Sequence, residues 1–302
     1  MEKFNIQHFA AETNITKTTD LEPAISVDFT SRISSTLKAL QEVLGITAMQ
    51  PMAEGTQIKI YKYNKTNSPA QVAEGEKINL TKVERKLIAT KELTVKKYRR
   101  EATAEAIQRS GKAVAINGCD AKLVNELQKD IKADFFTMVT GTTGVTTATA
   151  GATLQAACAN AWASLNAKFE DEDVNAVYFI NPVDLAGYLG NAEITMQTAF
   201  GLSYISNFLG LGTVIVSPKV TAGTVFATAK ENLNGAYIPT SGALGEVFGL
   251  TTDETGMVGM VHTPKTETAS IETLLLSSVL FYPERADGIV KAAITPAEVA
   301  KG

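Results

Sequence analysis

The feature that most constrains this chain is a basic stretch between Pro51 and Glu101 that alternates like a strand and shows no helical period. From Glu54 to Glu101 there are twelve Lys and Arg against six acidic residues, so the stretch carries +6. Since the whole chain of 302 residues carries −4, the remainder carries −10. The stretch holds too few large apolar residues to build a core of its own. We therefore expect a ribbon that projects from the body and lies on a partner. Another copy of this chain could be that partner, because the rest of the chain is acidic.

The alternation within this stretch predicts a long β-hairpin. Thr56–Tyr63 alternates apolar and polar residues, a second strand region follows at Ile78–Thr94, and the segment between them is rich in turn formers such as Pro69. An isolated two-stranded hairpin is marginal in water, so this one needs a surface to lie on. The candidate contact residues between subunits are basic side chains spread along the hairpin: Lys59, Lys62, Lys77, Lys82, Arg85 and Lys86.

Three interpretations of the basic hairpin stay open at this stage: a solvated face, a nucleic-acid surface and a self-assembly arm. Interleaved aromatic residues, Tyr61, Tyr63 and Tyr98, support the nucleic-acid surface. The acidic remainder of the chain supports self-assembly. A sequence pI near 5.4 argues against an ordinary nucleic-acid binder, which presents a net basic footprint to phosphates.

A long amphipathic helix is predicted over residues 120–139. Asp120 is placed to cap its start and Gly141 to end it. The apolar residues that recur at helical spacing are Val124, Leu127, Ile131, Phe135 and Met138. The opposite face carries Lys122, Glu126, Lys129, Asp130 and Asp134. This pattern predicts a surface helix whose apolar face lies along a core or sheet.

The rest of the chain alternates helices and strands, which is typical of an α+β protein. Residues 11–20 predict a polar arm, and Ile33–Leu44 a short helix after it. A second amphipathic helix is marked by Leu154, Cys158, Trp162, Leu165 and Phe169. A buried strand is predicted at Ala176–Ile180, a short helix begins at Asn181-Pro182, and the chain is mostly strand-like from Gly245 onward.

No catalytic, metal or cofactor site is predicted. The only histidines, His8 and His262, lie in the polar start and in a strand, and we interpret His262 as a strand-edge residue. No His, Cys, Asp and Glu cluster has ligand spacing. Cys119 and Cys158 are expected to be reduced structural thiols. Apolar runs fall far short of the roughly 18 residues of a membrane span, and the start does not resemble a signal peptide. The sequence therefore predicts a soluble, non-enzymatic protein.

The order of these parts resembles the major capsid protein of tailed bacteriophages, which has the Hong-Kong-ninety-seven-type fold. The resemblance is carried by the arm, the basic hairpin containing Val72–Gly75, the amphipathic helix, the compact α+β region and the return to strands from Phe281-Tyr282-Pro283 to Gly288-Ile289. The opening residues NIQHFA are also similar to the starts of capsid proteins of phages of Gram-positive hosts.

This resemblance implies a domain organisation. Residues 1–50 would form the N-terminal arm and a short helix, and 51–97 the extended loop that lies over a neighbouring subunit. Residues 98–145 and 243–302 would form the peripheral domain with the long spine helix, whose core face is Val124, Leu127, Ile131 and Phe135. Residues 146–242 would form the axial domain, with the last strand of the chain possible in either domain.

The resemblance also implies a function and partners. The chain would self-assemble through hexamers and pentamers into an icosahedral head that encloses double-stranded DNA, contacted weakly and non-specifically. Its partners would be itself, a portal protein, a separate scaffolding protein and decoration proteins, with assembly in the host cytoplasm, no membrane and no cofactor. Met1 favours the separate scaffold over a processed chain. The alternative is an encapsulin-type compartment, which shares the fold and packages an enzyme.

Overall fold

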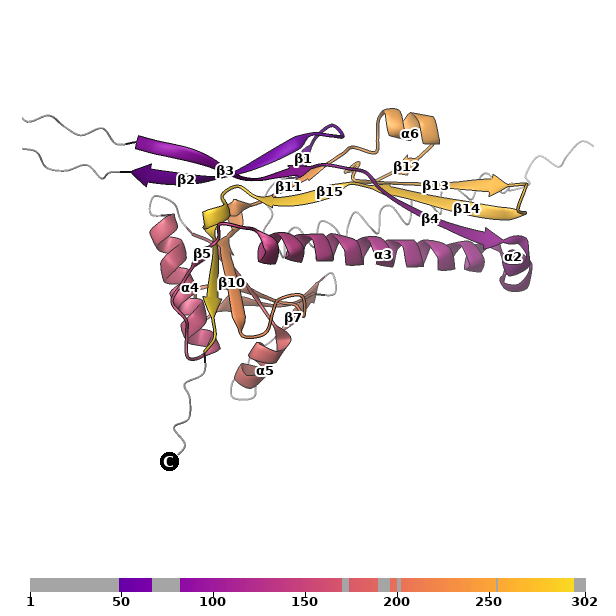
Figure 1. The fold of residues 1–302 in the computed structure, drawn as a ribbon. Helices are drawn as coiled ribbons and strands as arrows, with labels where there is room; N and C mark the ends of the chain where they lie inside the picture. The colour runs from indigo at the N-terminus through magenta and orange to yellow at the C-terminus, as the bar shows by residue number, and fades with distance from the viewer. Residues whose placement is uncertain are drawn as a thin grey trace, which may run out of the picture.

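A thirty-residue helix, α3 (Lys112–Gly141), runs beneath an antiparallel sheet (Figure 1) and shares its hydrophobic core with three of the four described sheets. The computed structural model describes residues 49–66, 82–169, 174–189, 196–199, 202–253 and 255–295. The predicted arm and its helix, and the hairpin segment that contains Lys77, lie outside the described residues. Within them, the chain is the predicted mixture of helices and strands.

The sheet above α3 has four antiparallel strands in the order β12-β13-β14-β4. Their bounds are Thr251–Thr252 for β12, Val258–Lys265 for β13, Ser270–Ser277 for β14 and Lys96–Thr103 for β4. The short helix α2 (Ala104–Ser110) turns the chain from β4 into α3, and the Thr103 hydroxyl accepts a hydrogen bond from the Ala106 amide at its start. A further short helix, α6 (Ala243–Phe248), lies on the other side of this sheet (Figure 1).

The apolar face of α3 is buried as its spacing requires. Leu127, Ile131 and Phe135 are each at most 3% exposed, and Val124 packs half-buried against the same core. The Phe135 ring lies 5.5 Å from that of Phe179 and 5.4 Å from that of Phe281. Since these two rings belong to two further sheets, one aromatic cluster joins the helix to both of them.

A seven-stranded mixed sheet lies below α3, in the order β5-β16-β10-β6-β9-β8-β7. Its strands are β5 (Thr146–Thr147), β6 (Ala176–Ile180), β7 (Gln197–Ala199), β8 (Leu202–Phe208), β9 (Gly212–Val216), β10 (Thr224–Ala229) and β16 (Ile289–Ala293). The helix α4 (Leu154–Lys168) packs on β10 and β16, and α5 (Pro182–Leu189) follows β6. The Asn181 side chain accepts from the Val183 amide, as a helix cap does.

Two small sheets complete the structure. β1 (Met49–Pro51), β11 (Leu233–Tyr237) and β15 (Val279–Pro283) form one, and the hairpin of β2 (Gln57–Thr66) and β3 (Lys82–Glu92) forms the other. Short 3-10 turns, η1 (Lys230–Asn232) and η2 (Ala286–Gly288), precede β11 and β16. Gly235 admits the crossing Met49 side chain, because a Cβ at this position would lie 2.0 Å from the Met49 sulfur.

Two sequence expectations about helices are wrong. The helix α3 begins at Lys112, eight residues before Asp120, and Asp120 is buried inside it. Trp162, expected on the buried face of α4, is 40% exposed, whereas Leu154, Cys158 and Leu165 are buried. The small residues Ala157 and Ala161 lie fully buried on the inner face of α4 together with Cys158 and Leu165, so the buried stripe is rotated away from Trp162.

We predict that Phe135→Ala lowers the free energy of unfolding by about 3–5 kcal/mol, because it opens a cavity at the centre of the aromatic cluster. Chemical denaturation followed by circular dichroism measures this. The matched control is Phe248→Ala, whose ring is 49% exposed and whose loss should cost under about 1 kcal/mol. Equal small losses in both variants would contradict the role given to Phe135.

The two free cysteines should differ sharply in reactivity. Cys158 is completely buried under α4, and this burial raises the pKa of its thiol to about 12, so near neutral pH it stays a protonated, unreactive thiol. Cys119 is partly exposed. Labelling of the folded protein with a maleimide should therefore modify Cys119 alone, and mass spectrometry after denaturation should show a second adduct. Fast labelling of Cys158 in the native state would show that α4 opens from the sheet.

Candidate subunit-assembly surface

The base of the β2–β3 hairpin is anchored in the body. Ile58 is 9% exposed and Ile60 is 2% exposed, and Ile58 packs with Leu93, Ala236 and Ile238 in a core cluster of its own. The Leu93 carbonyl also accepts a hydrogen bond from the Gly55 amide at 3.0 Å. The two apolar residues of the predicted strand thus fix the direction in which the hairpin leaves the body.

Beyond this base the hairpin changes character at a bulge between Ile60 and Tyr61. β2 and β3 extend from the body at the upper left of Figure 1. Tyr61 stands opposite Leu87, which is 47% exposed, and the Arg85 guanidinium lies 3.6 Å from the centre of the Tyr61 ring. A bulge adds local twist, so it turns the outer hairpin relative to its buried base.

The outer hairpin places like charges side by side. Lys62 and Lys86 are directly opposite each other in the ladder, an arrangement that destabilises a hairpin on its own. Lys59, Lys62 and Lys86 form no ion pair with any residue that the structure describes. An acidic surface supplied by another molecule would neutralise this repulsion. The hairpin therefore has the charge distribution of a docking element.

The other predicted hairpin residues are placed less completely. Lys82 is the first residue of β3, and nothing is described of its side chain. Arg85 is engaged with Tyr61 by the stacking described above, and Lys77 lies outside the described residues. The structure thus brings Lys59, Lys62, Arg85 and Lys86 together on one hairpin.

Some of the basic charge counted in the sequence is neutralised within the subunit. Alternate residues of β4 point at α3 and pair with helix residues four apart. The pairs are Lys96 with Asp134, the Tyr98 hydroxyl donating to Asp130, and Arg100 with Glu126. Two strand residues advance about 6.7 Å and four helix residues about 6 Å, so the two rows stay in register over three steps.

This ladder gives the acidic residues of the charged face of α3 partners on β4. Glu126, Asp130 and Asp134 lie against β4, so the helix is held to the sheet along its polar side as well as its apolar side. Burial and the Asp130 hydrogen bond raise the pKa of Tyr98 well above its usual range. Its phenol therefore stays protonated and continues to donate across the physiological pH range.

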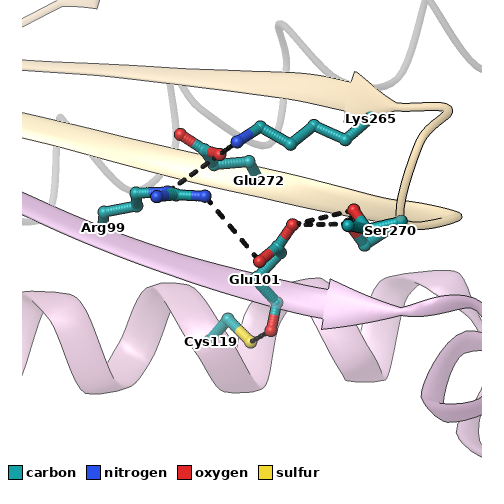
Figure 2. A network of polar contacts seen from close by, with 7 residues as sticks. Arg99, Glu101, Cys119, Lys265, Ser270 and Glu272 are labelled. Atoms are coloured by element: carbon teal, nitrogen blue, oxygen red, sulfur yellow. Dashed lines mark hydrogen bonds and ion pairs between the residues drawn. The ribbon is translucent and has the colours of Figure 1, made fainter.

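A second polar network lies at the far end of the four-stranded sheet, on β4, β13 and β14 (Figure 2). The Arg99 Nε atom is 2.9 Å from a Glu272 oxygen, and Lys265 pairs with the same carboxylate. The Ser270 hydroxyl donates to Glu101 at 2.7 Å. These contacts tie the three strands together where the sheet is narrowest.

His262 and Asp120 form a buried pair between β13 and α3. The His262 Nε2 atom lies 3.0 Å from an Asp120 carboxylate oxygen, and the two side chains are 2% and 0% exposed. His262 lies on the edge of the sheet as predicted. The short strand β12 pairs with β13 only at Gly259 and Met260, so beyond Met260 β13 has no described neighbour on that side. Its side chain turns inward instead of outward, which the sequence did not indicate. A substrate cannot reach either group, so the pair fixes the helix to the sheet.

No group of three or more His, Cys, Asp and Glu residues is placed to hold a metal ion within the ranges that the structure describes. In the same part of the chain, none of the helices is long and apolar enough to cross a membrane.

Comparison with known proteins connects this fold with shell proteins. No protein-family model and no curated protein matches the sequence. Among solved structures, the capsid of an empty GTA particle matches with a TM-score of 0.52 at 10% identity, over 97% of this chain and 95% of the other. The major capsid proteins of phage G, solved with decoration proteins, match with a TM-score of 0.50 at 11% identity, over 82% and 88%. The SrpI encapsulin of Synechococcus elongatus PCC 7942 matches with a TM-score of 0.52 at 10% identity, over 82% and 85%.

These matches cover most of each chain, and at such identities they establish the fold. The chain has the Hong-Kong-ninety-seven-type capsid fold of tailed phages, as its order of parts indicated. The solved structures that share it are shells of phages, GTA particles and encapsulins, which are structural proteins and not enzymes.

The network in Figure 2 generates a pH prediction. The hydrogen bond from Lys265 and the charge of Arg99 lower the pKa of Glu272, so Glu272 stabilises the folded state at neutral pH and loses this effect as pH falls through its lowered folded-state pKa. Glu272→Gln should therefore melt below the unmodified protein at neutral pH, and the difference should shrink toward about pH 3. Calorimetry across this range is the measurement. Glu267→Gln, at an exposed position without a described contact, is the control, and a pH-independent difference would contradict the prediction.

Proposed function

We propose that this protein is the major structural subunit of a phage-like head, which self-assembles through hexamers and pentamers into an icosahedral shell around double-stranded DNA. The observation that carries the proposal is the β2–β3 hairpin, whose base is buried and whose outer part presents lysines without an acidic partner in the described structure. The capsid fold supports the same conclusion.

The charge balance supports another copy of this chain as the partner of the hairpin. The stretch from Glu54 to Glu101 carries +6 in a chain of net charge −4, so each subunit offers both a basic hairpin and an acidic body. Each surface ion pair contributes under about 1 kcal/mol, but a shell repeats the contact in every subunit. The proposal includes a scaffolding protein, a portal protein and decoration proteins as further partners, weak non-specific contact with DNA, assembly in the host cytoplasm and a final location in the virion.

Division of the chain into an extended loop at 51–97, a peripheral domain at 98–145 and 243–302, and an axial domain at 146–242 is part of this proposal. Under this proposal, the four-stranded sheet with α3 would form the peripheral part and the seven-stranded sheet the axial part. The strand β16 lies in the seven-stranded sheet beside β10, which favours the axial domain for the end of the chain.

A second candidate is an encapsulin-type compartment. The match to the SrpI encapsulin supports it as strongly as the phage matches support a head. The two functions differ in contents. Particles purified from producing cells are treated with nuclease and then opened. Protected double-stranded DNA supports the head, and a protein cargo without DNA supports the compartment.

We predict that shortening the hairpin abolishes shell formation and leaves the subunit folded. Lys62–Lys86 is replaced by a short Gly/Ser linker, which retains the buried Ile58 and Ile60 and so keeps the base intact. Electron microscopy and light scattering should then show soluble subunits or capsomers without shells. Intact shells from this variant would refute the assembly role of the hairpin.

We also predict that the double variant Lys62→Glu with Lys86→Glu weakens assembly in a salt-dependent way. The variant keeps a like-charged pair across the ladder, so the hairpin itself is matched and only the charge shown to a partner is reversed. Screening should reduce the difference from the unmodified protein as salt rises. The control reverses two exposed lysines of α3, Lys122 and Lys129. If shells form normally and only DNA retention is lost, the hairpin is a nucleic-acid surface instead.

A further inference from the structure

The outward face of α4 is an uncharged apolar surface on the side of the body from which the hairpin projects (Figure 1). From Leu154 to Ala167 the helix contains no charged residue, in a chain that is 20% charged. Its exposed residues are Gln155, Ala159, Trp162, Ala163 and Ala167, followed by the charged Lys168 at the last position of the helix. Trp162 is 40% exposed and is the only tryptophan of the chain. Depletion of charge around an exposed aromatic residue is typical of the core of a protein interface.

A second uncharged surface lies at the opposite end of the seven-stranded sheet. The described residues 196–199 and 202–218 contain no charged side chain, and they include β7, the last strand in the sheet order. Met196, which precedes β7, is 41% exposed, and Leu209, in the turn between β8 and β9, is 45% exposed. Natural edge strands are usually protected by charges, and the described part of this edge has none.

The two surfaces cannot meet within one subunit. α4 packs on β10 and β16, whereas β7 is separated from β10 by three strands, and Figure 1 shows α4 and β7 on opposite sides of the body. Two different patches on opposite sides fit a head-to-tail contact between identical copies, which closes into a ring when the rotation allows it.

We propose that the α4 face around Trp162 packs against the β7–β8 edge around Met196 of a second copy of this chain. This contact joins the bodies of neighbouring subunits, and the hairpin of the first subunit extends over the same neighbour because it leaves the body on the α4 side. The inference rests on the proposed shell function and assigns the surfaces that form the ring.

The first test uses Trp162 as its own reporter. Fluorescence from the only tryptophan should shift to shorter wavelength when subunits assemble, because an interface removes the indole from water. Trp162→Glu should remain folded, since the side chain is 40% exposed, and should associate about tenfold or more weakly, as for an interface tryptophan. The matched control is Val247→Lys, at a position 78% exposed on α6, which should assemble normally. Circular dichroism and melting temperature show that both variants are folded.

The second test is directional cross-linking in a Cys119→Ser background, where Cys158 is buried and inert. A short bismaleimide is applied to assemblies that carry Trp162→Cys together with Met196→Cys. A ladder of covalent species that extends beyond the dimer is expected, while each single variant should give little product. Dimers from Trp162→Cys alone would show a two-fold contact and overturn the proposal, as would the absence of cross-links in assembled particles.

The outcomes separate this inference from the proposed function. If the unmodified protein never assembles, even with a scaffold, the shell function fails. Suppose instead that the unmodified protein forms shells without a shift of its tryptophan emission, and that Trp162→Glu forms shells equally well. The shell function then stands, and the ring contact proposed here is wrong.

Discussion

The structure depends on the packing of one helix face against three sheets at once. Phe135 contacts Phe136 on its own helix, Phe179 in the seven-stranded sheet and Phe281 in the three-stranded sheet, with ring centres 5.4–5.5 Å apart. Aromatic rings bury large areas and pair in edge-to-face geometry, so this cluster fixes the layers relative to one another. The four-stranded sheet is then held to the same helix by the polar ladder and by the buried pair of His262 and Asp120.

Under the proposed shell function, this arrangement would let a subunit be rigid in its body and still present surfaces for assembly. The base of the hairpin is closed by Ile58, Ile60 and Leu93, so the strands beyond the bulge inherit a fixed direction. Their lysines face one another without local acidic partners, which makes contact with another molecule favourable. In the proposed contact between copies, the uncharged surfaces of the lower body would supply affinity and the charged hairpin would supply orientation.

Much of the fold could be predicted from the sequence because its signals are local. The spacing of Leu127, Ile131 and Phe135 requires a helix with one buried face, and the alternation at Thr56–Tyr63 requires a strand. The capping role of Asn181 was readable in the same way. Asp120 was misread because aspartate is common at helix starts, and only the distant His262 explains why it is buried within a helix.

The sequence by itself therefore determined the kind and order of the elements. It also determined that the hairpin stretch is basic while the rest of the chain is acidic. The tertiary structure alone decided which of those charges are neutralised, because Lys96 and Arg100 find their acids on α3 while Lys62 and Lys86 find only each other. It also decided that Trp162 faces outward, because the stripe of α4 that packs on the sheet is the one that contains Ala157, Ala161 and Leu165. Local pattern fixes the faces of an element, and only packing between distant segments fixes what each face meets.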